Sequence, residues 1–232
     1  MKIGGFLKNS LIDFPGTLAC VVFTQGCNFK CPYCHNPDLI PMKRIEESVN
    51  ISEKELFEFL EKRKNLLDGV VISGGEPTLQ KDILAFCRKI KQMGFKLKLD
   101  SNGSRPEILS RLFEESLVDF VAMDIKTRPD MYSLVWDGAA SKISDSITCI
   151  MEKAPAYEFR TTCAKPFITP EILEDIGRLV QGASSYVLQS CSRKIQVLEP
   201  SFIADPANFY LAEEIAQLRE SIQQYVDCTS VR

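Results

Sequence analysis

Three cysteines lie close together in this 232-residue chain, at Cys27, Cys31 and Cys34. Their spacing puts three thiols into one loop, directly after an apolar run that ends at Thr24. A short loop of this kind can wrap three thiolates around one iron–sulfur cubane. Because structural clusters normally have four cysteine ligands, three would leave one iron open to a substrate or cofactor. The pattern therefore predicts a 4Fe–4S cluster that does chemistry at its open iron.

Two other interpretations of these cysteines stay open at this stage. A structural zinc ion needs a fourth ligand, which His35 or Cys20 could supply. The cysteines could also be inert buried side chains, although their density argues against it. A disulfide framework is the weakest reading, since the chain is mid-sized and its nine cysteines are an odd number. His35 is the only histidine, and we expect it to have a structural role rather than to donate protons.

A glycine pair follows the second apolar run, in the stretch Gly74-Gly75-Glu76-Pro77. Two glycines remove side chains where a ligand could approach the backbone. Glu76 adds an acceptor that could hold an ammonium group. The alternative is an ordinary turn between a strand and a helix.

Polar residues also end the third apolar run, where Asp100, Ser101 and Asn102 stand in sequence. Such a cluster suits ribose hydroxyls or a cation. Turn chemistry alone would explain it equally well.

Charged residues end the next strands. Asp124 and Lys126 are two apart, so they share one strand face and point toward a polar pocket. Arg160 could clamp a carboxylate with its planar fork of donors. Gln189 ends the last apolar run on the same face as Cys191. Solvated or structural ion pairs are the alternative for each, but their common placement at strand ends favours one site.

Alternating apolar and amphipathic segments must position these residues. The strand pattern predicts six strands, at Ala19–Thr24, Gly69–Ser73, Lys96–Ser101, Val118–Ile125, Glu158–Cys163 and Ser185–Gln189. The helical pattern predicts six helices, at Glu53–Asn65, Asp82–Met93, Pro106–Glu115, Lys142–Glu152, Pro170–Gln181 and Asn208–Val226.

Six strand-then-helix units imply an α/β fold with mainly parallel strands. Since a closed barrel needs eight units, we expect a partial (β/α)6 barrel, with the cysteine loop after the first core strand. A flat doubly wound sheet is the alternative. We expect one domain over residues 1–232, with a core at about 15–205 and a C-terminal helix at about 207–226 packed on it.

Composition excludes several classes of protein. The formal net charge is −3 and basic residues are scattered, so the sequence predicts no nucleic-acid partner. Because no apolar run approaches a membrane span and no signal peptide is evident, we expect a soluble cytoplasmic protein without a membrane partner.

The cysteine pattern with Tyr33 before its last cysteine, together with the Gly74–Pro77 stretch, resembles the radical S-adenosylmethionine (radical SAM) superfamily. The opening of the chain, from Ser10-Leu11-Ile12-Asp13-Phe14-Pro15-Gly16 to Cys34-His35-Asn36, resembles the activating enzymes of glycyl radical enzymes. Within that group the chain is most similar to activating proteins of anaerobic ribonucleoside-triphosphate reductase, supported by Glu158–Thr162 and Tyr186–Gln189.

This resemblance implies a radical SAM oxidoreductase that needs anaerobic conditions. It would cleave S-adenosylmethionine reductively and take hydrogen from a glycine of a partner glycyl radical enzyme. A flavodoxin- or ferredoxin-type protein would donate the electron. One 4Fe–4S cluster would be the resident metal group, with no second cluster and with a monovalent cation as an optional addition.

The resemblance also assigns residues. The three cysteines would ligate the cluster, and no further catalytic side chain is implied. The remaining positions would contact the cofactor: Tyr33 by the adenine, Gly74, Gly75, Glu76 and Pro77 by the amino group, Asp100, Ser101 and Asn102 by the ribose and cation, and Asp124, Lys126, Arg160 and Gln189 by its other polar groups.

Some residues depart from the pattern. Gln189 stands where related activases have a histidine, and Cys191 stands where the closest subgroup has an aromatic residue. Cys163 is also unusual at the end of its strand. Two alternative functions remain: a radical SAM enzyme acting on a small molecule, like 7-carboxy-7-deazaguanine synthase, or a non-catalytic iron–sulfur or zinc-binding module.

Overall fold

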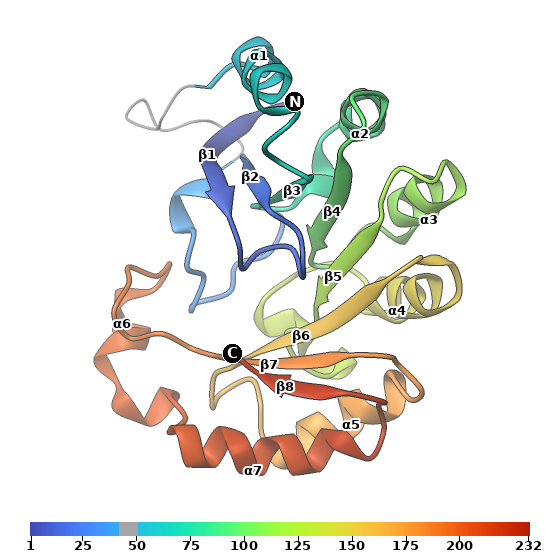
Figure 1. The fold of residues 1–232 in the computed structure, drawn as a ribbon. Helices are drawn as coiled ribbons and strands as arrows, with labels where there is room; N and C mark the ends of the chain where they lie inside the picture. Colours follow the sequence, from blue (N-terminus) through green and yellow to red (C-terminus); the bar gives the residue numbers. More distant parts are fainter. Residues whose placement is uncertain (42–50) are drawn as a thin grey trace.

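The computed structural model describes residues 1–41 and 51–232. Within these residues the strands form one eight-stranded sheet in the order of the sequence, curved as Figure 1 shows. Strand β1 runs antiparallel to β2, and every later neighbour pair is parallel. The strands are β1 (Ile3–Ser10), β2 (Ala19–Thr24), β3 (Gly69–Gly74), β4 (Lys96–Ser101), β5 (Phe120–Asp124), β6 (Tyr157–Cys163), β7 (Tyr186–Ser190) and β8 (Thr229–Val231).

Helices connect the parallel strands. They are α1 (Glu53–Arg63), α2 (Ile83–Gln92), α3 (Pro106–Glu114), α4 (Ser141–Lys153), α5 (Pro170–Leu179), α6 (Pro200–Ala204) and α7 (Ala212–Gln223). Side-chain caps mark the starts of two of them: Ser52 and Glu55 cap α1 reciprocally, and the Thr169 hydroxyl accepts from the Ile172 amide at α5. None of the helices in the described residues is long and apolar enough to cross a membrane.

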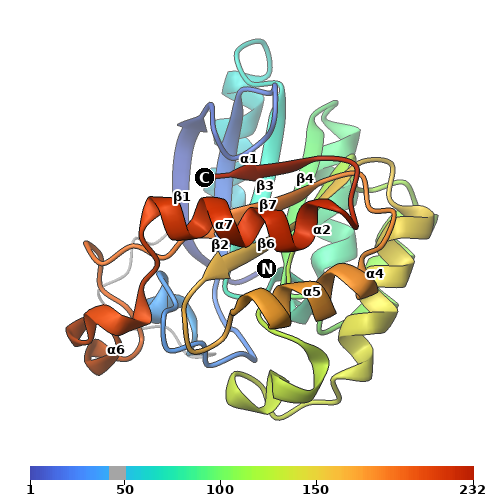
Figure 2. The same cartoon turned by 90° about the horizontal axis from the view of Figure 1, so that it is seen from below.

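The sheet is an open barrel rather than a flat doubly wound sheet. Figure 1 shows α1 to α5 arranged around the outside of the curved sheet, with the strands on the inner side. Strands β1 and β8 are the two ends of the hydrogen-bonded order, so the barrel does not close. Figure 2, seen from below, shows α5 and α7 crossing near β6, β7 and β8. The predicted partial barrel of six parallel β/α units is therefore confirmed, with an added strand at each edge.

Among the described residues, two strands and one α-helix were not predicted from the sequence. Strand β1 carries a glycine pair and a Lys-Asn-Ser end, which hide its alternation. Strand β8 is only three residues long, and α6 only five. The predicted last helix begins later than expected, at Ala212, because residues 206–208 form a separate 3-10 turn.

Side chains inside the barrel form two layers. Near the start of the strands, Phe14, Ala19, Val21 and Val71 make a small apolar cluster with Phe120 packed against it. Further along the same strand faces, Phe23 still packs against this cluster, whereas Ser73, Asp100 and Asp124 are polar. Side chains two residues apart share a strand face, so these polar residues point into the barrel as the apolar cluster does. They stand at the strand ends, and the polar layer therefore lies at the carboxyl ends of the strands. That layer forms the candidate site.

Candidate functional site

The cysteine loop leaves the end of β2 and is closed on itself by hydrogen bonds. The backbone amides of Gly26 and Cys27 donate to the carbonyls of Leu39 and Ile40, at 2.7 and 3.0 Å. The buried Gln25 amide donates to the carbonyls of residues 38 and 41 at 2.9 and 2.8 Å. The two ends of the loop are therefore tied together.

Two distant segments hold the middle of this loop. The Lys30 amide donates to the Val135 carbonyl at 2.8 Å, and the Glu199 amide donates to the Pro32 carbonyl at 3.0 Å. The Tyr33 ring packs against Phe167 and Phe202, with ring centroids 5.1 and 5.9 Å away. Contacts from both sides thus fix how the loop presents its thiols.

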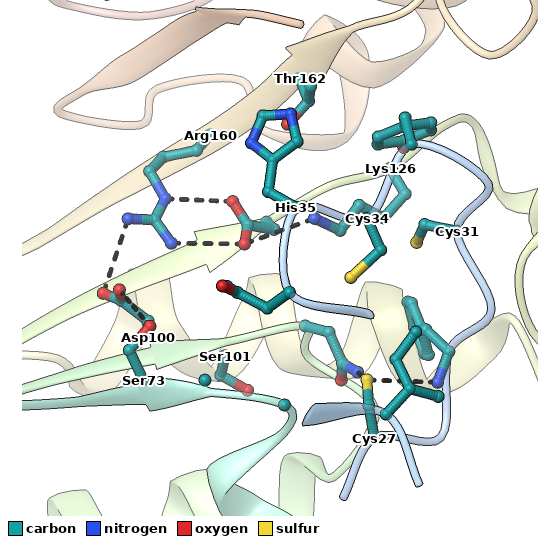
Figure 3. Close-up of a pocket in the computed structure, with 18 of the residues that line it drawn as sticks. Cys27, Cys31, Cys34, His35, Ser73, Asp100, Ser101, Lys126, Arg160 and Thr162 are labelled. Atoms are coloured by element: carbon teal, nitrogen blue, oxygen red, sulfur yellow. Dashed lines mark hydrogen bonds and ion pairs between the residues drawn. The ribbon is translucent and has the colours of Figure 1, made fainter. Parts of the chain in front are cut away.

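The three cysteine thiols line one pocket, and Figure 3 shows their sulfur atoms turned toward a common space. The Phe29 amide donates to Cys27 Sγ at 3.4 Å, a contact that favours a thiolate. Burial raises the pKa of Cys27 to about 12 and that of Cys31 to about 11, and it also raises the pKa of Cys34. Buried thiols of this kind become thiolates only next to strong positive charge, which a metal group supplies.

The donor set fits an iron–sulfur cluster better than zinc. In the described ranges, no three His, Cys, Asp or Glu side chains converge closely enough to hold a single metal ion. A cluster of several metal atoms can be reached by thiols that lie further apart. The pocket beside the thiols has a volume of about 230 Å³, which leaves room for a ligand. Lys126 adds positive charge beside the loop, which acts to lower the pKa of both Cys31 and Cys34.

The glycine pair after β3 lies against the start of the cysteine loop. A Cβ atom on Gly74, whose φ is +110°, would come within 2.4 Å of the Thr24 amide. A Cβ atom on Gly75 would come within 2.2 Å of the Gly26 carbonyl oxygen. Both glycines line the pocket. Because neither has a side chain, the two backbone segments can touch, and this part of the pocket wall carries no side chain.

Glu76 does not act as the sequence suggested. Its side chain is fully buried and is not part of the pocket wall. The carboxylate accepts hydrogen bonds from the amide and hydroxyl of Thr78, the Ser101 hydroxyl and the Asn102 amide. It therefore ties the turn after β3 to the end of β4 instead of holding an ammonium group. Pro77, also buried, begins the 3-10 turn at residues 77–79 and does not face the pocket.

Charged side chains from three adjacent strands form a network along the pocket wall (Figure 3). Arg160 donates from Nε to Asp124 Oδ1 at 3.0 Å and from Nη2 to Oδ2 at 3.3 Å. Its Nη1 lies 3.5 Å from Asp100 Oδ1. Lys126 Nζ lies 3.4 Å from Asp124 Oδ2, and the Ser73 hydroxyl donates to Asp100 Oδ2 at 2.9 Å.

The network keeps its members charged. Burial acts to raise the pKa of Asp124, but the positive charges of Arg160 and Lys126 outweigh it and lower the pKa to about 2. Burial likewise opposes ionisation of Asp100, whose pKa is nevertheless lowered by Arg160 and Lys98. Burial acts to lower the pKa of Lys126, but the combined attraction to Asp124, Cys31 and Cys34 outweighs it, so the pKa is raised. The pocket wall is therefore ionic at neutral pH.

A monovalent cation does not fit among Asp100, Ser101 and Asn102. Both Asp100 oxygens are engaged, one by Lys98 and Arg160 and the other by Ser73. The Ser101 hydroxyl is committed to Glu76, and the Asn102 side-chain oxygen accepts from the Ser104 amide at 3.0 Å. With these side-chain oxygens already bonded, the structure gives the expected monovalent cation no support at these three residues.

The structure brings most of the predicted residues together. The predicted site residues that line the pocket are Cys27, Cys31, Tyr33, Cys34, Gly74, Gly75, Asp100, Ser101, Asn102, Asp124, Lys126, Arg160 and Gln189. His35 and Thr162 line it too. Cys163 is fully buried at the end of β6, and Cys191 is partly buried just after β7. Gln189 and Thr162 are register partners on β7 and β6.

Sequence reasoning did not single out Gln25, Ser73 or Lys98. Gln25 lies next to the cysteine segment, but nothing in its spacing marks a loop clamp. Ser73 precedes the glycine pair by one residue and shares a strand face with Val71, which was a usable signal. Lys98 sits in the alternating stretch Lys-Leu-Lys-Leu-Asp of β4, which suggests a solvent-facing lysine. Because Lys98 stands two residues before Asp100, the two side chains share a strand face, and this spacing indicates that Lys98 points into the barrel.

Comparison with known proteins gives the same picture over most of the chain. Residues 21–180 match the family model described as the Radical SAM superfamily. A Methanocaldococcus jannaschii protein whose name proposes a glycyl-radical enzyme activating enzyme is 33% identical over 240 residues, covering 99% of this chain and 95% of that protein. The pyruvate formate-lyase-activating enzyme of Streptococcus mutans is 36% identical over 135 residues, covering 53% of this chain and 50% of that enzyme.

Solved structures share the fold at low sequence identity. The crystal structure of QueE from Escherichia coli aligns with a TM-score of 0.58 and 15% identity, over 99% of this chain and 92% of that one. Streptococcus suis SuiB aligns with a TM-score of 0.63 and 14% identity, over 91% of this chain and 48% of that one. With the pocket geometry and the full-length relative, these matches show that the chain belongs to the radical SAM superfamily, in the family of the glycyl-radical enzyme activating enzymes.

Proposed function

We propose that this chain reductively cleaves S-adenosylmethionine and takes a hydrogen atom from a glycine of a partner enzyme. The observation that carries the proposal is the convergence of three thiols from one loop on a pocket walled by charged strand ends. The full-length relative, whose name proposes the same kind of activity, supports it.

The chain's own residues would hold both groups in place. Cys27, Cys31 and Cys34 would ligate a 4Fe–4S cluster. The backbone at Gly74 and Gly75 would receive the amino end of the cofactor, where no side chain intervenes. Lys126 and Arg160 would present donors to its anionic group.

Other residues would orient the nucleoside end. Tyr33 would lie against the adenine, with its ring held by Phe167 and Phe202. Ser101 and Asn102 would lie by the ribose, and Gln189 would contact the cofactor from β7. Bound cofactor and partner would displace water from this pocket, which would protect a reactive species from side reactions.

When bound, the cluster would supply the electron for reductive cleavage of the S–C5′ bond, and the cofactor would supply the hydrogen-abstracting chemistry. A flavodoxin- or ferredoxin-type protein would deliver the electron. The reaction would take place in the cytoplasm, where thiols are kept reduced.

We further propose anaerobic ribonucleotide reductase as the partner. The stretches Glu158–Thr162 and Tyr186–Gln189, which resemble those of its activating proteins, lie on neighbouring strands β6 and β7. Their ends face the pocket at Arg160, Thr162 and Gln189. An open barrel can admit a polypeptide loop more easily than a closed one.

The test begins with protein reconstituted anaerobically with iron and sulfide, reduced, and mixed with S-adenosylmethionine. The expected product is 5′-deoxyadenosine, measured first without a partner. Purified anaerobic ribonucleotide reductase is then added, and pyruvate formate-lyase is used in a parallel sample. A glycyl-radical EPR doublet should appear on the reductase.

Each outcome separates one part of the proposal. A doublet on pyruvate formate-lyase alone would reassign the partner but keep the activity. Formation of 5′-deoxyadenosine with no doublet on either partner would favour a small-molecule substrate. Zinc in place of iron in protein prepared anaerobically would overturn the activity itself.

A further inference from the structure

Lys98 is a buried charged residue outside the pocket wall. Only 2% of its side chain is exposed, on a strand in the middle of the sheet. Its Nζ lies 2.5 Å from Asp100 Oδ1 and 6.0 Å from the centre of the Phe120 ring. Lys98 therefore stands between the apolar cluster inside the barrel and the ionic layer above it.

The backbone explains this position. Residues 98 and 100 share a strand face, so an extended lysine can reach the carboxylate two residues further along. The register of β4 with β5 sets Lys98 opposite Phe120, whose ring forms the floor beneath the ammonium group. A buried ammonium is costly unless it is paired, so its pairing with Asp100 is a built feature rather than a surface contact.

The protein itself already supplies more positive than negative side-chain charge around Asp100. Lys98, Lys126 and Arg160 supply three positive charges against the carboxylates of Asp100 and Asp124. Each carboxylate oxygen of the pair has a donor within 3.5 Å. An alkali ion at Asp100 would have to displace Lys98, or lie against the remaining excess of positive charge.

We propose that Lys98 is a positioning residue that serves as a built-in counter-ion for Asp100, in the place where a monovalent cation would otherwise sit. Asp100 is thereby held in its ionised form and in one orientation at the pocket wall. The consequence, which rests on the proposed function, is that S-adenosylmethionine binds to this chain independently of alkali cations.

The first experiment measures the affinity of the cluster-loaded protein for S-adenosylmethionine by equilibrium dialysis under anaerobic conditions. The chloride salts of potassium, sodium and tetramethylammonium are compared at equal ionic strength. The wild type should change by less than about twofold among the salts, since no ion is linked to binding. The Lys98→Met variant should bind about tenfold more weakly in tetramethylammonium, and potassium or sodium should restore it.

Two further variants serve as controls. Lys98→Arg keeps the charge and should remain insensitive to the salt. Lys91→Met removes a lysine that pairs with Asp119 on the outside of the barrel, and it should behave as the wild type does. Neither should gain alkali-ion dependence.

A second experiment needs no cofactor and is informative even if the proposed function fails. Equilibrium dialysis with radioactive rubidium should show no stoichiometric site in the wild type and about one site in Lys98→Met. One rubidium ion per wild-type chain would overturn the assignment of Lys98. So would a wild-type affinity for S-adenosylmethionine that collapses in tetramethylammonium. If Lys98→Met does not fold, the two wild-type measurements still decide the question.

Discussion

Arg160 and Asp124 are register partners across the β5–β6 ladder, and their side chains pair on the barrel side of the sheet. The guanidinium meets both carboxylate oxygens, at 3.0 and 3.3 Å, with 12% and 22% of the two side chains exposed. The pair thus joins two neighbouring strands through side chains as well as through the backbone.

Arg160→Lys should destabilise the protein although it keeps the charge. A lysine cannot supply two parallel donors to Asp124 and a third toward Asp100. We expect a loss of about 2 kcal/mol in the free energy of unfolding, measured by urea denaturation. Arg178→Lys, at an exposed arginine paired with Glu174 and Asp175, is the matched control and should change little. Equal losses of unfolding free energy at both positions would contradict the interpretation that Arg160 stabilises the fold through its parallel guanidinium donors.

Replacing Cys27, Cys31 or Cys34 singly by alanine should abolish cluster assembly, because in the proposed site each thiol would supply one of three protein ligands. Iron content and the visible absorption of reconstituted protein are the measurements, and 5′-deoxyadenosine formation should be lost with them. Cys228→Ser changes an exposed cysteine outside the pocket and should leave iron content unchanged. Retained cofactor cleavage in the three alanine variants would remove the basis of the proposed function.

Gly75→Ala should disturb the site without touching a ligand residue. The new methyl would meet the Gly26 carbonyl oxygen, which belongs to the backbone and cannot rotate away. We expect a destabilisation of about 1–3 kcal/mol or more, together with poorer iron retention, because the cysteine loop must move. Gly5→Ala on β1 is the control, since its methyl would make ordinary contacts of 3.5 Å or more with Phe23. A tolerated Gly75→Ala would show that the two backbones can separate freely.

The loss of unfolding free energy at acid pH should depend on Asp124. Its pKa in the folded protein is about 2, below the ordinary value of 3.8, so the stabilisation is present above pH ~4 and is lost as pH falls toward 2. The shift corresponds to about 2 kcal/mol in the free energy of unfolding. The difference in unfolding free energy between wild type and Asp124→Asn should therefore shrink over that interval. Asp130→Asn, at an exposed aspartate, gives the baseline for exchanging a carboxylate for an amide.

Tyr33→Phe should be close to neutral for stability in the absence of cofactor. The Tyr33 hydroxyl is buried and has no hydrogen-bond partner among the described residues. Removing it therefore breaks no bond and relieves a desolvated group, so we expect a change between zero and about 1 kcal/mol of stabilisation. Tyr33→Ala should cost about 3–5 kcal/mol, since the ring packs against Phe167 and Phe202. Thermal unfolding of the two variants separates these roles, and a strongly destabilised Tyr33→Phe would point to a missing partner.

Much of the fold follows from the sequence because its core strands are short apolar runs separated by amphipathic helices. Strands β2 and β4 begin and end at the predicted residues, and helices α1 to α5 begin within one residue of prediction, whereas α7 begins later and α6 was not predicted. Strand β1 escaped prediction because its glycines and polar end suppress the two-residue period. Its place in the sheet is set by pairing with β2, which is a long-range property.

The site was predictable as a set of positions, but not as a set of contacts. Parallel strands bring their carboxyl ends to one edge, so Asp100, Asp124 and Arg160 could be expected to meet. Which partner each would take depends on register and side-chain length. For that reason Glu76 was expected to face a ligand, although four buried donors hold it elsewhere. Lys98 was missed for the same reason.

The match in register between Asp124 and Arg160 has a further consequence for how the chain folds. A slip of one residue between β5 and β6 would turn one of the two side chains to the opposite face of the sheet. The charge that turns would then be buried among the apolar residues that pack against the helices, and the other charge would stay in the barrel without its partner. The ionic pair therefore penalises misaligned pairing much more than an apolar pair would. The residues that give the pocket its charge therefore also favour the correct register between β5 and β6 during folding.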